Sequence, residues 1–463
     1  MKGSGASLVG QAHLGSVRSG SPRWRRLLST ASPPPLLVGV AAVALAAFTW
    51  RIGRPAFWLD EVATVQDASK PLPELLAFLR QRDAGLGPYY LAMHVWLRFG
   101  EAEWWARLPS ALAMVVAVVA ATDVARRHAG QWAGLLAGFL LVLSPAATRY
   151  AHEARPYAFA IAFAVLAVWV LDHLDGRRRW WAVYSGTVAL LGLSHVVGLV
   201  TLVAHPLFVW ASGDRRFGRW LVAAGVGVLP PAVVGWFAFQ ARSTVAWIPK
   251  PDLERVRLAF AEIVGGWEYL TLLGALAVVA VVRTRDRWTA GLVVWFAVPP
   301  LLLALVGLVT PLFLARYLVV CTPALVLLAA TAVRAPWQVA AGVVAAAVVA
   351  ATVIAWPEHQ RLRLPYGHGP DYRAAARAIA ADCTGGVAGR HSLAAVRTMP
   401  YYVEREGCEL PWLSGAVPAH VDRIWVVQWD WDRSEPTPGP GATVFRMVDD
   451  VTVPGLRLTL WRR

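Results

Sequence analysis

The sequence is poor in charged residues, which make up 16% of its 463 residues, whereas hydrophobic residues make up 57%. An ordinary soluble domain contains about 25% charged residues, so this composition predicts a polytopic membrane protein with modest water-exposed parts. Acidic residues are scarcer than basic ones, 29 against 44, which leaves a net charge of +15. Many arginines fall in short clusters between apolar runs, as topology signals do, and they match anionic lipid headgroups. We therefore expect membrane lipids, and no nucleic acid, as a partner.

Cysteine is rare as well, with three in the chain. Cys321 lies in an apolar run and is predicted to be inert filler. Cys383 and Cys408 lie in the polar C-terminal part, where they either form a disulfide or remain two free thiols. The sequence also has no internal repeat, no phosphate-cradling Gly-rich loop and no clustered His/Cys metal motif.

Apolar runs that approach the roughly 20 residues of a membrane-spanning helix recur as far as residue 356. We expect about eleven spans, near 33–50, 105–123, 132–148, 157–175, 181–196, 198–212, 220–240, 267–282, 288–308, 313–332 and 337–356. With the N-terminus inside, this arrangement places the basic clusters on the cytoplasmic side, namely Arg126-Arg127, Arg177 to Arg179, Arg215-Arg216, Arg283 to Arg287, and Arg334. Trp180 to Asp214 has basic clusters at both ends and must cross an even number of times, so we split it near Ser194-His195.

The chain divides into three predicted parts in the plasma membrane. Residues 1–32, rich in Ser, Gly and Arg, form a disordered cytoplasmic tail. Residues 33–356 form the transmembrane domain, in which a long first external loop (51–104) carries interfacial helices at Leu72 to Leu79 and from Gly87 to Trp96. Residues 357–463 form a small extracytoplasmic α/β domain. Its predicted elements are a helix over Asp371–Ala381 and strands over Arg423–Trp429, Thr443–Met447 and Leu456–Trp461.

Two adjacent acids, Asp60 and Glu61, lie just past the first apolar run. Carboxylates at a membrane boundary cost several kcal/mol if they are buried without partners, so such acids are functional candidates. The alternative is the solvated start of a loop. Tyr89 and Tyr90, later in the same loop, suit the headgroup zone. His94 is either functional or a core histidine satisfied by a neighbour.

The second external loop combines Arg149, Glu153, Arg155 and Tyr157. Arginine on the external side opposes the usual charge bias, and its planar fork matches phosphate geometry, which predicts an anion site. The alternative is an internal Glu–Arg pair that ties two helix ends together. Arg316-Tyr317 poses the same choice. An external carboxylate that deprotonates a hydroxyl, with arginines that stabilise a phosphate leaving group, would suit sugar transfer from a polyprenyl-phosphate donor.

At these residues the chain resembles bacterial family-39-like glycosyltransferases of the GT-C superfamily, relatives of protein O-mannosyltransferases and lipid A aminoarabinose transferases. The resemblance runs from about Phe57 to Pro323. Its landmarks, in order, are Trp58-Leu59-Asp60-Glu61, Gly87-Pro88-Tyr89-Tyr90 leading to Trp96, Arg107-Leu108-Pro109-Ser110, Ser144-Pro145, Glu153-Ala154-Arg155-Pro156-Tyr157, and Arg316-Tyr317.

The resemblance implies a GT-C-like helical bundle and an inverting transferase that takes a sugar, mannose or similar, from a polyprenyl-phosphate donor. Asp60 would be the general base, and Glu61 would help to position the acceptor or the base. Arg155 and Arg316 would contact the phosphate, supported by Glu153 and Tyr157. The sequence leaves open a protein, lipid or polysaccharide acceptor. It shows no ligand cluster for a divalent metal, so we expect a metal-independent enzyme.

Two other classes of protein compete with the enzyme. A lipid-linked glycan flippase or transporter would also have many spans and external arginines, but it is expected to place charged or discontinuous segments near the bilayer midplane, often in matching halves. The notable charges here cluster at one face. A non-catalytic scaffold that binds cell-wall polymer is the second rival.

Overall fold

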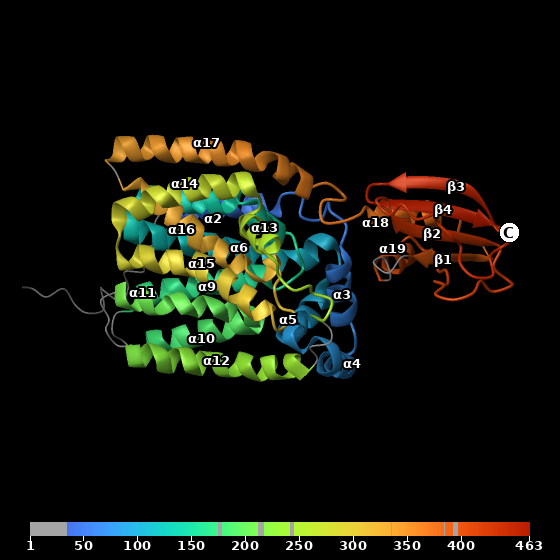
Figure 1. Ribbon diagram of the computed structural model, residues 1–463, viewed down its shortest axis with the longest axis horizontal. Coiled ribbons are helices and arrows are strands. Elements are labelled where there is room, and N and C mark those ends of the chain that lie inside the picture. Colours follow the sequence, from blue (N-terminus) through green and yellow to red (C-terminus); the bar gives the residue numbers. More distant parts are fainter. Residues whose placement is uncertain are drawn as a thin grey trace, which may run out of the picture.

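The structure is a computed structural model that describes residues 35–174, 178–211, 217–240, 245–334, 336–383, 385–391 and 397–463. The predicted tail, residues 1–32, lies outside these residues. A bundle of long helices occupies one end of the molecule and a small sheet the other (Figure 1). Side chains of the two parts pack in one hydrophobic cluster, so the two parts are in contact.

Helices occupy each predicted span. They are α2 (Pro35–Thr49), α6 (Glu103–Ala129), α7 (Gln131–Leu143) with α8 (Pro145–Ala151), α9 (Tyr157–Asp172), α10 (Arg178–Ser194), η4 (Val196–Ala204) with α11 (His205–Ala211), α12 (Phe217–Gln240), α14 (Trp267–Thr284), α15 (Arg287–Gly307), α16 (Thr322–Ala330) and α17 (Trp337–Leu362). Among the described residues, α6, α12, α14, α15 and α17 are long and apolar enough to cross a membrane alone, and the bent pair α7–α8 makes a sixth. The prediction of a mainly helical, multipass membrane protein is confirmed, whereas the number of spans stays a prediction.

Two breaks within the bundle have local causes. Ser144 caps α8 through its hydroxyl, which accepts a hydrogen bond from the Ala147 N–H at 3.4 Å, and Pro145 starts that helix, so α7 and α8 meet at 62°. The other break follows Ser194, where α10 ends and His195 is extended before the 3-10 helix η4. The predicted split near Ser194-His195 is confirmed.

Several basic turns lie together at the end of the bundle away from the sheet, where α17 begins (Figure 1). Arg334 donates to the carbonyl of His128 at 2.9 Å and pairs with Asp286 at 3.4 Å. Arg283 donates to the carbonyl of Ala332 at 3.3 Å. These contacts join three turns that are far apart in the sequence, so their positive charge gathers at one end.

The segment predicted to be the first external loop is helical for most of its length. It forms α3 (Leu59–Ala68), α4 (Leu72–Phe78), the π-helical turn η1 (Leu79–Asp83), the 3-10 turns η2 (Ala84–Leu86) and η3 (Leu97–Phe99), and α5 (Gly87–Trp96). The helices predicted at Leu72 and Gly87 are confirmed. The sequence did not predict α3. Asp60 and Glu61 lie in the first turn of this helix and not in a solvated loop. The sequence also missed the amphipathic helix α13 (Leu253–Val264).

The C-terminal part is a four-stranded sheet with helices, in the strand order β1-β2-β4-β3. Its elements are β1 (Val387–His391), β2 (Arg423–Trp429), β3 (Arg446–Val453), β4 (Leu456–Arg462), α18 (Tyr372–Ala380) and α19 (Thr398–Arg405). β1 and β2 are parallel, and the other pairs are antiparallel. The predicted helix and two of the strands are confirmed, the strand expected at Thr443 begins at Arg446, and β1 and α19 were not predicted. A disulfide joins Cys383 and Cys408, and buried Cys321 is free.

The first loop and the C-terminal part share one hydrophobic core. Phe57, Val62 and Tyr90 from the loop pack in the same cluster as Tyr372 and Met399. Polar contacts reinforce this junction: the Phe57 N–H donates to the Tyr402 hydroxyl at 2.6 Å, which donates to Glu103 at 3.0 Å, and Arg397 pairs with Asp67 at 2.8 Å. Helix α17 also runs through Pro357 to Leu362, past the predicted boundary. The sheet is therefore fixed against the end of the bundle that holds Asp60 and Glu61.

Candidate active site

The start of α3 fixes the direction of the two acids. Trp58 precedes the helix in an extended conformation, and the Glu61 carboxylate accepts a hydrogen bond from the Trp58 N–H at 3.4 Å, as the acid of a capping box does. Asp60 and Glu61 are consecutive in the first turn, so their side chains leave the helix about 100° apart. One carboxylate therefore faces the protein interior while the other faces a partly open space.

Glu61 is fully enclosed and its charge is neutralised. Arg107 from α6 donates to both of its oxygens, at 2.7 and 2.6 Å, and the Ala154 N–H donates to it at 2.8 Å. Both side chains of this ion pair are completely buried. The remaining Arg107 donors reach the carbonyls of Ile52, Pro55 and Ala56. Glu61 has no exposed surface that an acceptor could contact. Of its two predicted roles, positioning the acceptor or positioning the base Asp60, only the second fits this burial.

Asp60 faces two arginines that come from distant parts of the chain. Its Oδ2 lies 3.3 Å from Arg316 and 3.7 Å from Arg155, and 24% of its side chain is exposed. Arg155 also donates to the Asp60 carbonyl at 3.4 Å and to the Thr64 hydroxyl at 3.3 Å. Asp60 is therefore held loosely by charge at an accessible position, whereas Arg155 is anchored on α3.

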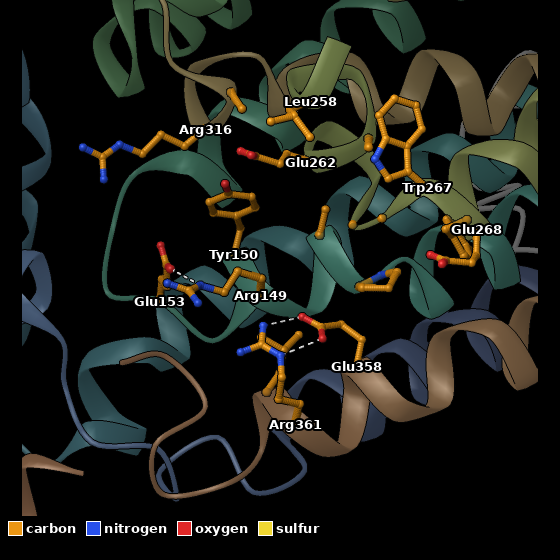
Figure 2. Close-up of a pocket in the computed structure, with 18 of the residues that line it drawn as sticks. Arg149, Tyr150, Glu153, Leu258, Glu262, Trp267, Glu268, Arg316, Glu358 and Arg361 are labelled. Atoms are coloured by element: carbon orange, nitrogen blue, oxygen red, sulfur yellow. Dashed lines mark hydrogen bonds and ion pairs between the residues drawn. The ribbon is translucent and has the colours of Figure 1, made fainter. Parts of the chain in front are cut away.

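A cavity of about 1140 Å³ opens beside this cluster. Arg316, Arg149, Glu153 and Tyr150 lie on one side of it, and Trp267 and Glu268 lie on the other (Figure 2). Leu258, Ala261, Ile354 and Leu362 add an apolar wall. Glu262 and the Glu358–Arg361 ion pair also line the cavity. A cavity that combines cations with an apolar wall suits an amphiphilic anion such as a lipid phosphate.

Trp58 links the cavity to Asp60. The Arg149 and Arg316 guanidinium groups lie 5.6 and 5.9 Å from its ring, within cation–π range, and Arg316 also lies 5.8 Å from the ring of Trp247. Arg149 forms an ion pair with Glu153, which realises the alternative of an internal Glu–Arg pair. Burial raises the pKa of the Glu153 carboxyl, although Arg149 opposes the shift. Arg149 thus serves both the pair and the cavity wall.

The predicted tyrosines lie near the arginine cluster, whereas the predicted histidine lies apart from it. Tyr89 and Tyr90 are buried beside the arginine cluster, and burial raises the pKa of Tyr90 to about 12, so it stays a neutral hydroxyl. Tyr157 and Tyr317 pack on His195, with ring centroids 5.6 and 4.7 Å away. His94 lies apart: its ring nitrogens contact the Ala68 carbonyl at 2.8 Å and Arg98 at 2.9 Å. Its place between α5 and the end of α3 matches the predicted alternative of a satisfied histidine.

Several residues of this region were not among the predicted site residues, and three of them, Arg107, Glu262 and Trp267, show why. Arg107 was visible as a cation near the start of an apolar run, and its partner was not. Glu262 and Trp267 line the cavity and come from α13 and the start of α14 (Figure 2). The charged, amphipathic pattern of Leu253–Val264 was the available signal for this wall. No group of three or more His, Cys, Asp or Glu side chains that could hold a metal ion occurs among the described residues.

Comparisons with known proteins found matches to part of the sequence and to the overall fold. The family model for dolichyl-phosphate-mannose-protein mannosyltransferases matches residues 83–237. The chain is similar in structure to ArnT from Cupriavidus metallidurans bound to undecaprenyl phosphate, with a TM-score of 0.61, 15% identity and coverage of 93% of this chain and 98% of ArnT. The apo state of ArnT gives a TM-score of 0.60 at 15% identity, with 92% and 98% coverage. The archaeal oligosaccharyltransferase AglB from Archaeoglobus fulgidus, in complex with an inhibitory peptide and a dolichol-phosphate, gives 0.50 at 11% identity, with 85% and 69% coverage. Curated protein sequences gave no match.

The fold is therefore GT-C-like and similar to that of ArnT over nearly the whole chain. The resemblance found in the sequence is confirmed, and the chain is a GT-C-like multipass membrane protein.

Proposed function

We propose that this protein transfers a sugar from a polyprenyl-phosphate donor to an acceptor with inversion, and that Asp60 is the general base. The observation that carries the proposal is the contact of Asp60 with Arg316, which also lines the large cavity. A proton acceptor and a phosphate-binding cation thus lie side by side at the mouth of an amphiphilic cavity. The ArnT structure bound to undecaprenyl phosphate supports a lipid phosphate as the ligand class.

The proposed reaction involves the acceptor hydroxyl, the Asp60 carboxylate and the arginines that contact the donor phosphate. The acceptor hydroxyl attacks the anomeric carbon while Asp60 takes its proton, and the bond from that carbon to the phosphate oxygen breaks. The electron pair leaves with the polyprenyl phosphate, whose growing negative charge Arg316 and Arg149 stabilise. Before the donor binds, Arg316 contacts Asp60 at 3.3 Å. We propose that the donor phosphate competes for Arg316 and so frees the Asp60 carboxylate to act as base.

Arg155 takes a different role in this proposal from Arg316. It is buried, holds Asp60 and Thr64 of α3, and does not line the cavity. We therefore assign it to the orientation of the base. The orientation of the protein follows from its charge: the basic turns at the far end of the bundle face the cytoplasm, and the sheet and Asp60 face outward in the plasma membrane.

Binding of radiolabelled undecaprenyl phosphate to purified protein in lipid nanodiscs tests the phosphate site. Arg316→Ala is expected to weaken binding about tenfold or more, since a charge-assisted contact to an anion contributes about 1.5–3 kcal/mol. The control is Arg255→Ala on α13, whose exposed side chain pairs with exposed Asp252 at 3.5 Å and does not line the cavity. Equal affinity of wild type and Arg316→Ala would remove Arg316 from the phosphate site.

A further inference from the structure

A second, smaller cavity of about 350 Å³ lies where the sheet meets the bundle. Its wall from the sheet includes Trp429, Asp430 and Trp431, and its wall from the segment after α17 includes Tyr366 and His368. Arg149 and Arg361 line this cavity and also the large one. The two cavities are thus neighbours that share part of their walls.

The aromatic side of the small cavity is a platform. Trp429 ends β2, and Trp431 lies in the turn that follows, where the two rings stack on each other. Their centroids are 6.0 Å apart and their planes differ by 20°. Trp431 is 71% exposed, and Tyr366 is 40% exposed. The exposed rings of Trp431 and Tyr366 thus line one cavity. Apolar surface that is gathered at one place and left exposed to water is typical of a ligand-binding site.

The polar groups of the cavity favour a neutral ligand. Both of its arginines are already paired, Arg149 with Glu153 and Arg361 with Glu358. Asp430 accepts a hydrogen bond from the Gly455 N–H at 3.1 Å through Oδ2, and its Oδ1 has no protein donor among the described residues. An acceptor oxygen beside aromatic faces suits a molecule with several hydroxyls and an apolar C–H face.

Backbone closes the rest of the cavity. Gly367 and Gly455 line it, and a Cβ at Gly367 would lie 2.5 Å from the carbonyl oxygens of Arg361 and Leu362. A Cβ at Gly369, on the same wall, would lie 3.5 Å from the Cβ of Trp58. The wall of the small cavity therefore packs close to Trp58, the residue that precedes α3 and contacts the arginines of the proposed donor site.

We infer that this cavity binds one sugar unit of a carbohydrate acceptor. The C–H face of the sugar would lie on Trp431 and Trp429, and one sugar hydroxyl would donate a hydrogen bond to the Asp430 carboxylate. The electron-rich faces of the indole rings attract the partly positive C–H groups of a sugar ring. The inference rests on the proposed function and deepens it, because it selects a glycan as the acceptor class among protein, lipid and polysaccharide. The acceptor chain then runs from the sheet past Trp58 to Asp60.

Direct binding of glycans tests the site without turnover. Full-length protein in lipid nanodiscs is applied to an array of immobilised mannan, arabinan and galactan oligosaccharides and Ser/Thr-containing peptides. Nanodiscs are used because the sugar headgroup of a maltoside detergent would compete for the site. Wild type is expected to bind at least one glycan class, and Trp431→Ala and Asp430→Asn are expected to bind it about tenfold more weakly, because an aromatic contact contributes on the order of a factor of ten.

The controls separate this inference from the transferase proposal. Met447→Ala changes another exposed apolar side chain of the same sheet and should bind like wild type. The binding measurement contains no donor, so its result does not depend on whether the protein transfers sugar. Because Trp431 is exposed, its replacement should leave the thermal unfolding temperature unchanged, which checks the fold. Glycan binding that survives in Trp431→Ala, binding to peptides in place of glycans, or no glycan binding by wild type would each overturn the inference.

Kinetic measurements test whether the sugar in this cavity belongs to the acceptor or to the donor. In a transfer assay, Trp431→Ala should raise the KM for a glycan acceptor about tenfold and leave the KM for the polyprenyl-phosphate donor unchanged. A rise in the donor KM alone would assign the cavity to the donor sugar and overturn its assignment to the acceptor.

Discussion

At the residue scale, the two acids of α3 differ in what surrounds each carboxylate. Glu61 has its charge cancelled by Arg107 and both its oxygens occupied, whereas Asp60 is partly exposed between two arginines. Adjacent positions in one helical turn are enough to produce this difference. The pair was visible in the sequence, but the division of roles was not, because Arg107 and Arg316 reach it only through the tertiary fold.

Replacement of Glu61 by Gln should destabilise the protein far more than replacement of Asp60 by Asn. Glu61→Gln leaves the Arg107 guanidinium buried without a countercharge, which costs about 3–5 kcal/mol. Asp60 is partly exposed and its ion pairs are long, so Asp60→Asn should cost about 1 kcal/mol or less. Thermal unfolding of both variants in nanodiscs measures the difference, and equal unfolding temperatures would contradict the assignment of Glu61 to structure.

The stability of the protein should fall at acidic pH because of His368, which lies where the sheet meets the bundle. Burial, and then the charges of Arg149 and Arg107, lowers the pKa of His368 well below its ordinary value, and Arg361 and neighbouring His152 act in the same direction. The folded state keeps this ring neutral, whereas the unfolded state protonates it below about pH 6.5. Its stabilisation is therefore complete above that pH and is lost as the pH falls, by up to about 1.4 kcal/mol per pH unit.

Thermal unfolding between pH 7.5 and 5 measures this effect. The His368→Leu variant should lose stability less steeply than wild type as the pH falls. Since burial also lowers the pKa of His152, part of the slope should remain in the variant. Identical slopes for wild type and His368→Leu would show that His368 does not bind its proton more weakly in the folded state.

At the scale of elements, α13 forms a wall of the large cavity because its C-terminus packs tightly on α8. The helix ends at Gly265, whose φ of +101° is left-handed. A Cβ at Gly265 would lie 2.6 Å from the Ala146 nitrogen and from the Pro145 Cβ. No side chain fits this contact without a shift of one helix against the other.

Gly265→Ala should therefore narrow or distort the cavity and weaken binding of undecaprenyl phosphate. We expect at least a tenfold loss of affinity, from backbone strain of about 1–3 kcal/mol together with the displaced wall. Gly274→Ala on α14 is the matched control, because a Cβ there would meet no atom within 4 Å. Unchanged affinity in Gly265→Ala would separate α13 from the donor site.

The elements that the sequence predicted well are those with a strong one-dimensional signal. Long apolar runs located the helices of the bundle, and a run of β-branched and aromatic residues located Arg423–Trp429, which is β2 with the same bounds. The sequence missed β1 because Gly389, Arg390 and His391 make it short and polar. It missed α3 and α13 because neither is apolar enough to span a membrane. Arg149 and Arg155 looked alike in the sequence, and only the fold pairs one with Glu153 and the other with Asp60.

At the scale of the whole molecule, the C-terminal part is joined by a common core to the end of the bundle that holds Asp60. Tyr372 and Met399 pack with Phe57 and Tyr90, and the Tyr402 hydroxyl bonds to the Phe57 N–H. The segment just before α3 therefore depends on the C-terminal part for its packing. A change in that part should reach Asp60 through structure as well as through acceptor choice.

Truncation after Leu362 should abolish folding of the first loop and not merely change the acceptor. The removed residues cover a large apolar surface of α3 and α5, whose exposure would cost about 25 cal/mol per Å². Size-exclusion chromatography and limited proteolysis of residues 57–100 report the outcome, with the point variant Trp431→Ala as a folded control. A monodisperse truncated protein with a protease-resistant loop would contradict the common core.

The most direct test of the account is a transfer assay on purified protein with a panel of radiolabelled polyprenyl-phosphate sugars and crude envelope acceptor. Wild type is compared with Asp60→Asn and with Glu101→Gln, an acid of the same loop that bonds to Ser69. We predict that label moves with wild type and Glu101→Gln, and that Asp60→Asn transfers it about 10²–10⁴-fold more slowly, the usual contribution of a general base. Transfer by Asp60→Asn at the wild-type rate would contradict the assignment of Asp60 as the base.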